Sequence, residues 1–332
     1  MYKVGIVGTG FGEYHLESLS ELRDYKIEYL CYRTDLAKAK SLASKYNIPH
    51  VTDNYLEIMR SDVDVVVVVA PVGMHYPIIK EAIKSDKHIV TDKPLALTSE
   101  ECNLIIDMSH NVTKKNMVFY QWRFNNRLKH LKYMLKQQEI GNIYAVNATF
   151  YTDFMADENI GYGWRHDSNC AGGGVTMDMG VHISDLLLWL TSGKIAPGYV
   201  IKHIVYPIRK SVDGSMAKTS TEDFYSMQFD LYATSLQHEN ILGYIQLCRT
   251  AHGLREMALQ FMGTKGTIRV IIDPFTGVGK TELNGKPCDV GADFVGSENP
   301  YYYFLQVLAG ENADIPVFQD GLNSILSLKK EN

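Results

Sequence analysis

Two patterns of hydrophobic and polar positions follow one another along this chain, and the change falls near residue 122. Up to that point, short apolar runs rich in β-branched residues alternate with segments of helical period. Runs such as 63–69 contain almost no polar side chains, which is typical of parallel strands buried on both faces. Strands that alternate with helices predict βαβ units around a parallel sheet.

The elements expected in this first part fall into two classes. The strands are 2–7, 26–32, 64–69, 87–91 and 116–120. The helices are 13–22, 35–46, 53–60, 75–85 and 98–110. Together they predict an α/β domain over residues 1–121 with a Rossmann-type, doubly wound parallel sheet.

After residue 122, strand patterns dominate and helices are few. The strands expected here are 143–153, 199–210, 223–232, 241–250, 256–262 and 266–272. The helices expected are 126–138, 178–190 and 320–329. The connection 263–266, with a glycine at each end, predicts a hairpin. Residues 122–332 are therefore expected to form a C-terminal α+β domain on a large, mainly antiparallel open sheet.

Several of these strands carry apolar residues on both faces, and the stretch 224–232 is rich in aromatic side chains. A monomer rarely leaves such a sheet face exposed to water. A second copy of the chain would cover it, so we expect a homodimer or homotetramer.

The composition narrows the class of protein. The 332 residues are enough for two domains, and a formal net charge of -5 leaves no broad basic surface for nucleic acid or an anionic membrane. The longest apolar run is too short to span a bilayer, and no signal peptide is visible. The five cysteines are scattered without a C-x-x-C pair, which favours reduced thiols in a cytoplasmic protein.

The first candidate site follows the first strand. Gly8 and Gly10 form a turn between this strand and a helix, an arrangement that cradles a pyrophosphate against free helix amides. Glu13 stands where the third glycine of the G-x-G-x-x-G pattern is expected. The alternative is a strand-turn-helix without a ligand. The residues expected to contact a dinucleotide here are Gly8, Thr9, Gly10, Phe11 and Gly12.

The tip of the second strand bears on the choice of dinucleotide. An NAD site usually places an acidic residue there for the ribose 2′-hydroxyl, but this chain has Tyr32. Arg33 and Thr34 follow, a cation and a hydroxyl suited to a 2′-phosphate, so NADP is favoured over NAD. The alternative makes Asp35 the ribose ligand or a helix N-cap.

Two further strand tips carry polar residues. Ala70, Pro71 and His75 follow one strand of the first domain, and Asp92 and Lys93 follow the next. Ligands bind at the carboxyl edge of the sheet in such folds, so we expect cofactor contacts here. Lys93 can orient a substrate oxygen and stabilise the negative charge that grows on it, with Asp92 as its partner. The alternative is a solvated surface pair before a turn.

The third candidate site lies in the second domain, after three glycines at 172–174. Asp178 and His182 are four residues apart and share one face of the predicted helix, with Asp185 three further on. A histidine beside a carboxylate can take or give a proton near neutral pH. One alternative is a capping aspartate with a structural histidine. Another is a metal pair, but no third ligand is spaced to complete it, so we expect no metal.

Polar residues outside these motifs are candidates for contacting a substrate. The loop that contains Trp164 and Arg165 can reach hydroxyl groups, and it could equally be a surface turn. Arg123, where the pattern of the chain changes, is assigned to the substrate as well.

Taken together, these motifs resemble the Gfo/Idh/MocA family of nicotinamide-dependent oxidoreductases, over essentially the whole chain. The resemblance rests on Gly8-Thr-Gly10, Ala70-Pro71 with His75, Asp92-Lys93-Pro94 in place of Glu-Lys-Pro, and the glycine run followed by Asp178, Gly180, His182 and Asp185. It implies that Lys93 and His182 act on the substrate carbinol and that Asp178 contacts the substrate or the histidine. It also points to a cis bond before Pro94.

The sequence thus predicts an NAD(P)-dependent dehydrogenase or reductase for a secondary alcohol or ketone of a sugar or cyclitol, with NADP as the first choice of cofactor. His182 would carry the proton and Lys93 would polarise the oxygen, with both residues and Asp178 around one cleft between the domains. The rivals are hydrolysis or elimination with a retained NAD, and a non-catalytic nucleotide sensor. A sensor would have no use for Lys93 and His182 together.

Overall fold

The structure is a computed structural model that describes residues 1–233 and 238–329. The chain divides into two compact units. Unit 1 comprises residues 1–121 and 299–322, and unit 2 comprises residues 122–298 and the segment that begins at residue 323.

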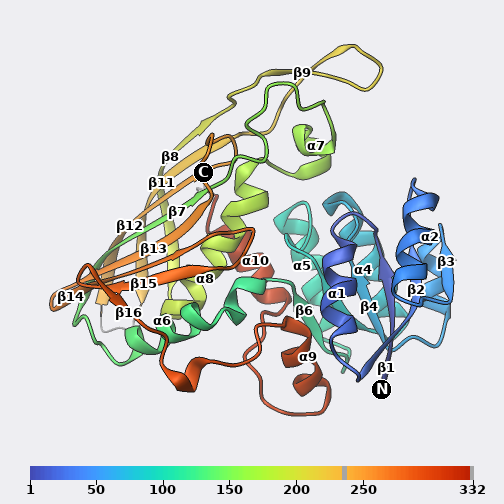
Figure 1. Ribbon diagram of the computed structural model, residues 1–332, viewed down its shortest axis with the longest axis horizontal. Helices are drawn as coiled ribbons and strands as arrows, with labels where there is room; N and C mark the ends of the chain where they lie inside the picture. Colours follow the sequence, from blue (N-terminus) through green and yellow to red (C-terminus); the bar gives the residue numbers. More distant parts are fainter. Residues whose placement is uncertain (234–237, 330–332) are drawn as a thin grey trace. The chain divides into compact units, whose positions relative to one another are not determined.

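A six-stranded parallel sheet forms the centre of unit 1 (Figure 1). Its strand order, β3-β2-β1-β4-β5-β6, is that of a doubly wound sheet, which confirms the predicted fold class. All four valines of β4 are fully buried, as the unbroken apolar run predicts. The strands are β1 (Tyr2–Val7), β2 (Tyr25–Cys31), β3 (His50–Thr52), β4 (Val65–Val68), β5 (His88–Thr91) and β6 (Asn116–Val118).

Five helices connect these strands at the expected places. They are α1 (Gly12–Ser20), α2 (Leu36–Lys45), α3 (Tyr55–Arg60), α4 (His75–Lys84) and α5 (Ser99–Ser109), and the 3-10 turn η1 (Val72–Met74) precedes α4. Strand β3 was not predicted, because its sequence His-Val-Thr has a single apolar residue and shows no apolar run.

Residues 299–322 belong to unit 1, whereas the second domain was expected to comprise everything after residue 121. The segment contains α9 (Pro300–Leu308), which no predicted element covers. Asn299 caps this helix through the backbone amide of Tyr301, and its Nδ2 donates to the Ser18 carbonyl at 2.7 Å. The Tyr301 side chain is fully buried. An Asn-Pro pair at a helix start was the sequence signal that could have revealed α9.

Unit 2 is built on an eight-stranded mixed sheet of order β16-β15-β14-β13-β7-β12-β11-β8. Its neighbouring strands pair antiparallel except β7 and β12, which run parallel, so the predicted mainly antiparallel sheet is confirmed. The strands are β7 (Ile143–Tyr151), β8 (Lys194–His203), β11 (Phe224–Ala233), β12 (His238–Cys248), β13 (Glu256–Gly263), β14 (Gly266–Ile272), β15 (Gly279–Leu283) and β16 (Lys286–Cys288).

The single strand expected over residues 199–210 is wrong, because the chain breaks after β8. The carboxylate of Asp223 accepts hydrogen bonds from the amides of Val205 and Tyr206, which turns these residues away from the sheet. The chain then continues into a separate two-stranded hairpin of β9 (Ile208–Lys210) and β10 (Met216–Lys218).

Helices α6 and α8 lie along one face of the large sheet (Figure 1). The opposite face exposes large apolar side chains, among them Ile201, Tyr232 and Leu242. No helix in the described part of the chain has the length and hydropathy needed to cross a membrane.

Two helical segments lie across the boundaries of the units. The segment η2 (Gln121–Phe124) begins at the last residue of the first stretch of unit 1, and α10 (Phe318–Leu326) has its last residues in unit 2. The other helical segments of unit 2 are α6 (Asn126–Lys136), η3 (Trp164–His166), α7 (Ser168–Ala171), η4 (Thr176–Gly180), α8 (Val181–Thr191) and η6 (Ala292–Phe294).

Candidate active site

The glycine turn after β1 has the geometry of a dinucleotide cradle. Gly8 has φ +122°, and a Cβ atom there would lie 2.5 Å from the Val69 carbonyl oxygen, so no other residue fits. Gly10 and Gly12 have no heavy atom within 4 Å of the place of a Cβ, which leaves open space beside the backbone. Helix α1 starts at Gly12, so its first amides are available to an anion, and these residues fit a pyrophosphate.

Glu13 does not close this cradle, although it replaces the third glycine of the motif. Its Oε1 lies 3.0 Å from Nζ of Lys45 on α2, and both side chains are about half exposed. The ion pair offsets the negative charge that would otherwise face a bound phosphate.

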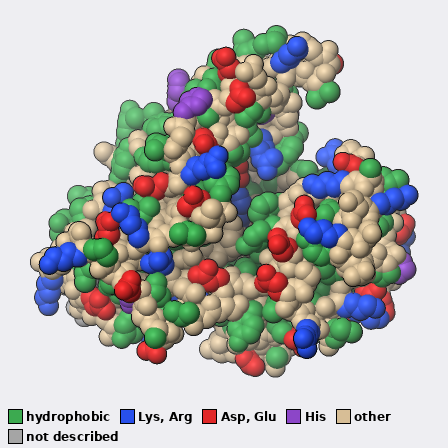
Figure 2. Space-filling view, in the orientation of Figure 1, with side chains coloured by type: hydrophobic (Ala, Val, Ile, Leu, Met, Phe, Trp, Pro, Cys, Tyr) green, Lys and Arg blue, Asp and Glu red, His purple; other side chains and the backbone are tan. Residues whose placement is uncertain are grey.

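The tip of β2 lies next to the glycine turn, because the amide of Gly8 donates to the Cys31 carbonyl at 2.9 Å. Arg33 and Thr34 follow this tip and are exposed. Asp35 accepts a hydrogen bond from the Lys38 amide at 2.8 Å and is the N-cap of α2, one of the two roles considered for it. Lys and Arg side chains also gather on the surface over α2 (Figure 2).

The two other strand tips of unit 1 are joined by a buried imidazole. His75, at the start of α4, lies with Nε2 2.8 Å from the Ala70 carbonyl oxygen and Nδ1 2.9 Å from that of Pro94. Its side chain is 1% exposed, and burial lowers its pKa. The structure therefore places His75 between the loops rather than on the surface of the cofactor cradle.

Lys93 follows β5 and is partly exposed, as is Asp92 beside it. The Lys93 amide donates to Oδ1 of Asp92 at 2.8 Å, which fixes the backbone at the strand end. The bond between Lys93 and Pro94 is cis, as expected.

Two of the three glycines at 172–174 hold positions that disfavour a side chain, Gly172 through its φ angle and Gly174 through a close approach to backbone. Gly172 has φ +73° and ends α7. A Cβ on Gly174 would lie 1.9 Å from the Glu222 carbonyl oxygen. The amide and hydroxyl of Thr176 donate to the Glu222 carboxylate, which ties the start of the next helix to the segment before β11.

Asp178 and His182 lie on one continuous helical segment, but its first part is not an α-helix. Asp178 lies in the π-helical turn η4, whose geometry is marked by the contact of the Val181 amide with the Thr176 carbonyl, and His182 lies in the first turn of α8. The Asp178 side chain is 29% exposed, and His182 is 4% exposed. Single π-turns inside helices are frequent at functional sites.

Three of the predicted substrate contacts lie together in unit 2. Nε of Arg165 is 3.9 Å from Oδ2 of Asp178, and the Arg165 guanidinium stacks 4.3 Å from the ring centroid of Trp164. Trp164 and Arg165 are each about 40% exposed. An aromatic face, a cation and a carboxylate are thus presented side by side, an arrangement that can hold a polyhydroxylated ring.

Arg123 has a different partner from the one expected. Its guanidinium is bidentate to Asp185 on α8, with Nε–Oδ2 and Nη2–Oδ1 distances of 2.9 and 2.5 Å. Both side chains are at least 95% buried. The ion pair anchors the segment after residue 121 to the helix that carries His182, and Arg123 acts there as a structural residue rather than a surface contact.

Sequence reasoning missed a buried network beneath the Trp164–Arg165 loop. Nε of Arg249 donates to Oδ1 of Asp223 at 2.8 Å, and both side chains are 1% exposed. Thr221 accepts from Nη2 of Arg249 at 2.9 Å and donates to the Arg165 carbonyl at 2.8 Å. The polar run 221–223 was the sequence signal that could have revealed this network. Phe224 pairs with Cys248 at the ends of β11 and β12, which brings this run beside Arg249.

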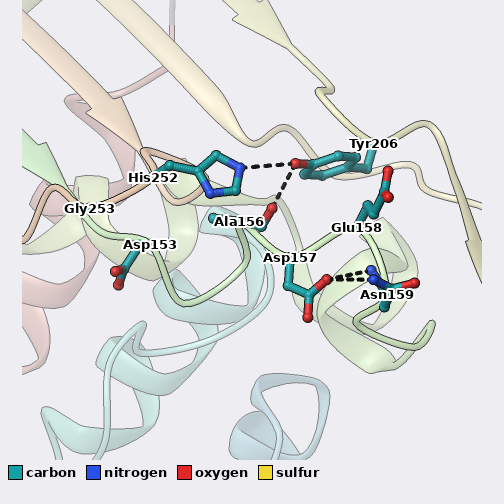
Figure 3. A pocket seen from close by; sticks show the side chains of 8 residues that line it. All are labelled: Asp153, Ala156, Asp157, Glu158, Asn159, Tyr206, His252 and Gly253. Atoms are coloured by element: carbon teal, nitrogen blue, oxygen red, sulfur yellow. Dashed lines mark hydrogen bonds between the residues drawn. The ribbon is translucent and has the colours of Figure 1, made fainter.

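A cavity of about 560 Å³ in unit 2 is lined by other residues (Figure 3). Among them, Oη of Tyr206 lies 3.5 Å from Nε2 of His252, and Oδ1 of Asp157 accepts hydrogen bonds from the amide and Nδ2 of Asn159. No predicted site residue lines this cavity. Within residues 1–233 and 238–329, no cluster of three or more His, Cys, Asp or Glu side chains could hold a metal ion.

Comparison with known proteins connects this geometry to a family. The model described as "Oxidoreductase family, NAD-binding Rossmann fold" matches residues 2–120, and the model described as "GFO/IDH/MocA C-terminal domain" matches residues 128–269. The two matches together cover most of the chain and include Lys93, Asp178 and His182.

Individual relatives are distant. The uncharacterized oxidoreductase YrbE of Bacillus subtilis is 25% identical over 310 residues, which cover 91% of this chain and 80% of the relative. Levoglucosan dehydrogenase of Pseudarthrobacter phenanthrenivorans is 24% identical over 281 residues, 80% of this chain and 72% of its own. A solved structure of levoglucosan dehydrogenase with NADH and L-sorbose shares the fold, with a TM-score of 0.84, 19% identity, and coverage of 99% of this chain and 96% of that one. With the Rossmann model and the C-terminal model both matched, the chain belongs to the Gfo/Idh/MocA family of NAD-binding oxidoreductases.

Proposed function

We propose that this protein is a dehydrogenase or reductase that interconverts a secondary alcohol and a ketone on a sugar or cyclitol, with NADP as the preferred cofactor. The observation that carries the proposal is the pairing of an open glycine cradle at Gly8–Gly10 with the polar cluster of Trp164, Arg165 and Asp178. A cradle alone would serve a nucleotide sensor, whereas the cluster supports a second, carbohydrate-like ligand.

The residues of unit 1 fit a dinucleotide, and the first domain is its binding domain in this proposal. Gly8, Gly10 and the first amides of α1 would hold the pyrophosphate, with Thr9 and Phe11 beside it. When bound, the nicotinamide accepts or supplies the hydride. Ala70 lies next to Gly8, and with Pro71, which follows it, would border the nicotinamide half.

His182 and Lys93 carry the proton and charge chemistry in the proposal. During oxidation, His182 takes the proton of the substrate hydroxyl, and during reduction it returns one. The Lys93 ammonium donates a hydrogen bond to the same oxygen and stabilises the negative charge that grows on it. Asp178 orients the imidazole or binds a neighbouring hydroxyl.

The preference for NADP rests on the exposed Arg33 and Thr34 at the tip of β2. The carboxylate of Asp35 caps α2. It is therefore not the acidic residue that binds the ribose 2′-hydroxyl in a usual NAD site. An arginine beside a hydroxyl is suited to a 2′-phosphate.

The choice of a sugar as substrate is supported by chemistry and by relatives. The stacked Trp164 and Arg165 offer an aromatic face and hydrogen-bond donors, which suit a ring with several hydroxyl groups. Levoglucosan dehydrogenase, a relative at 24% identity, is named for a sugar substrate. The second domain is thus the substrate domain, and its open sheet face would serve assembly into a homodimer or homotetramer.

A panel of sugars, sugar phosphates and inositols, tested with NADP⁺ and NAD⁺ at the nicotinamide absorbance, gives the direct test. The best substrate then serves for His182→Ala and Lys93→Ala, each expected to lower kcat by about 10²–10⁴-fold while cofactor binding survives. Asp178→Asn should lower kcat less if it orients the ring, and raise KM if it binds substrate.

The exposed His203 at the end of β8 supplies a matched control, and His203→Ala should leave kcat unchanged. A folded His182→Ala protein with near-normal turnover would refute the proton role of His182. The proposed function itself would be refuted if the protein bound neither dinucleotide and turned over no compound in the panel.

A further inference from the structure

His75 contacts two loops with its two ring nitrogens, and no catalytic step uses it. The ring lies between the carbonyl oxygens of Ala70, after β4, and Pro94, after β5, at 2.8 and 2.9 Å. The side chain is 1% exposed, so it cannot contact a substrate directly. Its partners, however, adjoin the candidate cofactor cradle and the lysine that would polarise the substrate oxygen.

The contacts form a chain across three strand ends. The place of a Cβ on Gly8 is 2.9 Å from the amide nitrogen of Ala70, so the glycine turn packs against the loop after β4. His75 joins that loop to the Pro94 carbonyl, one residue beyond Lys93. The backbone of Lys93 is held on its other side by Asp92.

We propose that His75 is a positioning residue, whose ring fixes the Pro94 carbonyl and with it the backbone from which Lys93 reaches the substrate oxygen. The inference rests on the proposed function, because it gives His75 its role through Lys93. A lysine displaced by about 1 Å from its productive position is enough to cost about a hundredfold in rate.

The chemistry of the contacts requires an N–H group. A carbonyl oxygen only accepts hydrogen bonds, so each ring nitrogen contributes when it carries a hydrogen. A neutral imidazole supplies one such donor and a protonated imidazole supplies two. To hold the Pro94 carbonyl, the group at position 75 must present an N–H where Nδ1 lies, because Nδ1 is the ring nitrogen that faces this oxygen.

His75→Ala should lower kcat about 10–100-fold, with the KM for the cofactor changed by less than about threefold, because the phosphate cradle is untouched. Added imidazole, which can refill the space, should restore kcat at least about tenfold. At about pH 9 the added rings are neutral. There, 4-methylimidazole, which keeps an N–H, should rescue, and 1-methylimidazole, which has none, should not.

Two further variants separate positioning from general damage. His15→Ala removes an equally buried imidazole from α1 of the same unit, and its kcat should not respond to imidazole. His75→Gln, which retains volume and an amide donor, should fall between wild type and His75→Ala in kcat and covers the case in which the alanine variant does not fold.

The coupling to Lys93 is tested in a double-mutant cycle. If His75 acts through Lys93, His75→Ala should cause no further loss of kcat in a Lys93→Ala protein. Near-normal kcat in both His75 variants, equal rescue by the two methylimidazoles, or a full additional loss in the Lys93→Ala background would each overturn the inference while the proposed function stands. Near-normal turnover of Lys93→Ala would instead overturn the role of Lys93 in the proposed function, and this inference with it.

Discussion

At the scale of single residues, the role proposed for Arg33 in cofactor preference can be tested most directly. Arg33→Ala should lower kcat/KM for NADP(H) about tenfold or more and leave the value for NAD(H) nearly unchanged, because a charge-assisted contact to the 2′-phosphate is lost. Steady-state kinetics with both cofactors would measure this.

Lys40→Ala provides the control, since it removes another exposed cation from α2 without touching the strand tip. A general loss of positive charge would affect both lysine and arginine variants alike. Equal activity with NADP(H) and NAD(H) before and after Arg33→Ala would rule out the proposed preference.

His15 leads to a prediction about stability and pH. The ring on α1 is fully buried with Nδ1 2.6 Å from Oη of Tyr301, and burial lowers its pKa from 6.5 to about 3. The folded protein keeps this ring neutral, whereas the unfolded chain protonates it below about pH 6.5. The free energy of unfolding should therefore fall as pH drops from 6.5 toward 3, by up to about 1.4 kcal/mol per pH unit from this residue.

His15→Gln removes this titration. Urea unfolding at a series of pH values measures the free energy of unfolding. Between pH 6.5 and 3, this free energy should fall less steeply for the variant than for wild type, with a difference in slope that corresponds to about one proton. Other buried histidines, such as His75, contribute equally to both proteins and cancel in the difference. Parallel curves for the two proteins would show that His15 does not carry the expected linkage.

Site residues were predictable from the sequence where their partners are close along the chain, and less so where the partners are distant. Gly8 and Gly10 were found because a glycine turn is specified by adjacent residues. The partner of Arg123 was missed, because Asp185 is 62 residues away and only folding brings the two together. The two roles of Asp35 stayed open, since capping and ribose binding call for the same residue type.

At the scale of elements, the approach of Gly174 to the backbone of Glu222 fixes the start of the helix that carries Asp178 and His182. Gly174→Ala would place a Cβ 1.9 Å from a carbonyl oxygen, and backbone cannot move aside as a side chain can. We expect a loss of about 3 kcal/mol in the free energy of unfolding, measured by urea titration, together with a reduced kcat.

Gly296→Ala is the matched control in the same unit, since no heavy atom lies within 4 Å of its Cβ position. Its stability should stay within about 0.5 kcal/mol of wild type. A Gly174→Ala protein as stable as this control would mean that the close approach does not constrain the helix.

The elements themselves were predictable to the extent that they were long and periodic. Strands β1, β11 and β14 match their patterns, whereas the strands β3 (His-Val-Thr) and β16 (Lys-Pro-Cys) have too few apolar residues to show one. The π-helical turn η4 was not foreseen, because its residues read as ordinary helix and tertiary contacts decide between the two geometries.

At the scale of the whole molecule, pattern alone did not show that residues 299–322 return to unit 1. The return depends on packing between segments nearly 300 residues apart, such as the hydrogen bond of His15 with Tyr301. A local period describes how a helix forms, but not which surface it covers. The division near residue 122 was visible only because the pattern of strands and helices changes there.

The open face of the large sheet is the expected surface for assembly. Leu242 on β12 pairs with Ala145 on β7, and its side chain is 64% exposed. It alternates with the buried Ile241, so it lies on the open face of the sheet. If two copies meet at this face, Leu242→Glu places like charges in an apolar contact on both sides of a twofold axis. We expect the mass measured by light scattering to fall toward that of a monomer, while circular dichroism shows a retained fold.

Val278→Glu, at a similarly exposed apolar residue in the loop before β15, should leave the mass unchanged. A wild-type protein that stays monomeric at every concentration would refute assembly through this sheet face, and an oligomer unaffected by Leu242→Glu would place the interface elsewhere.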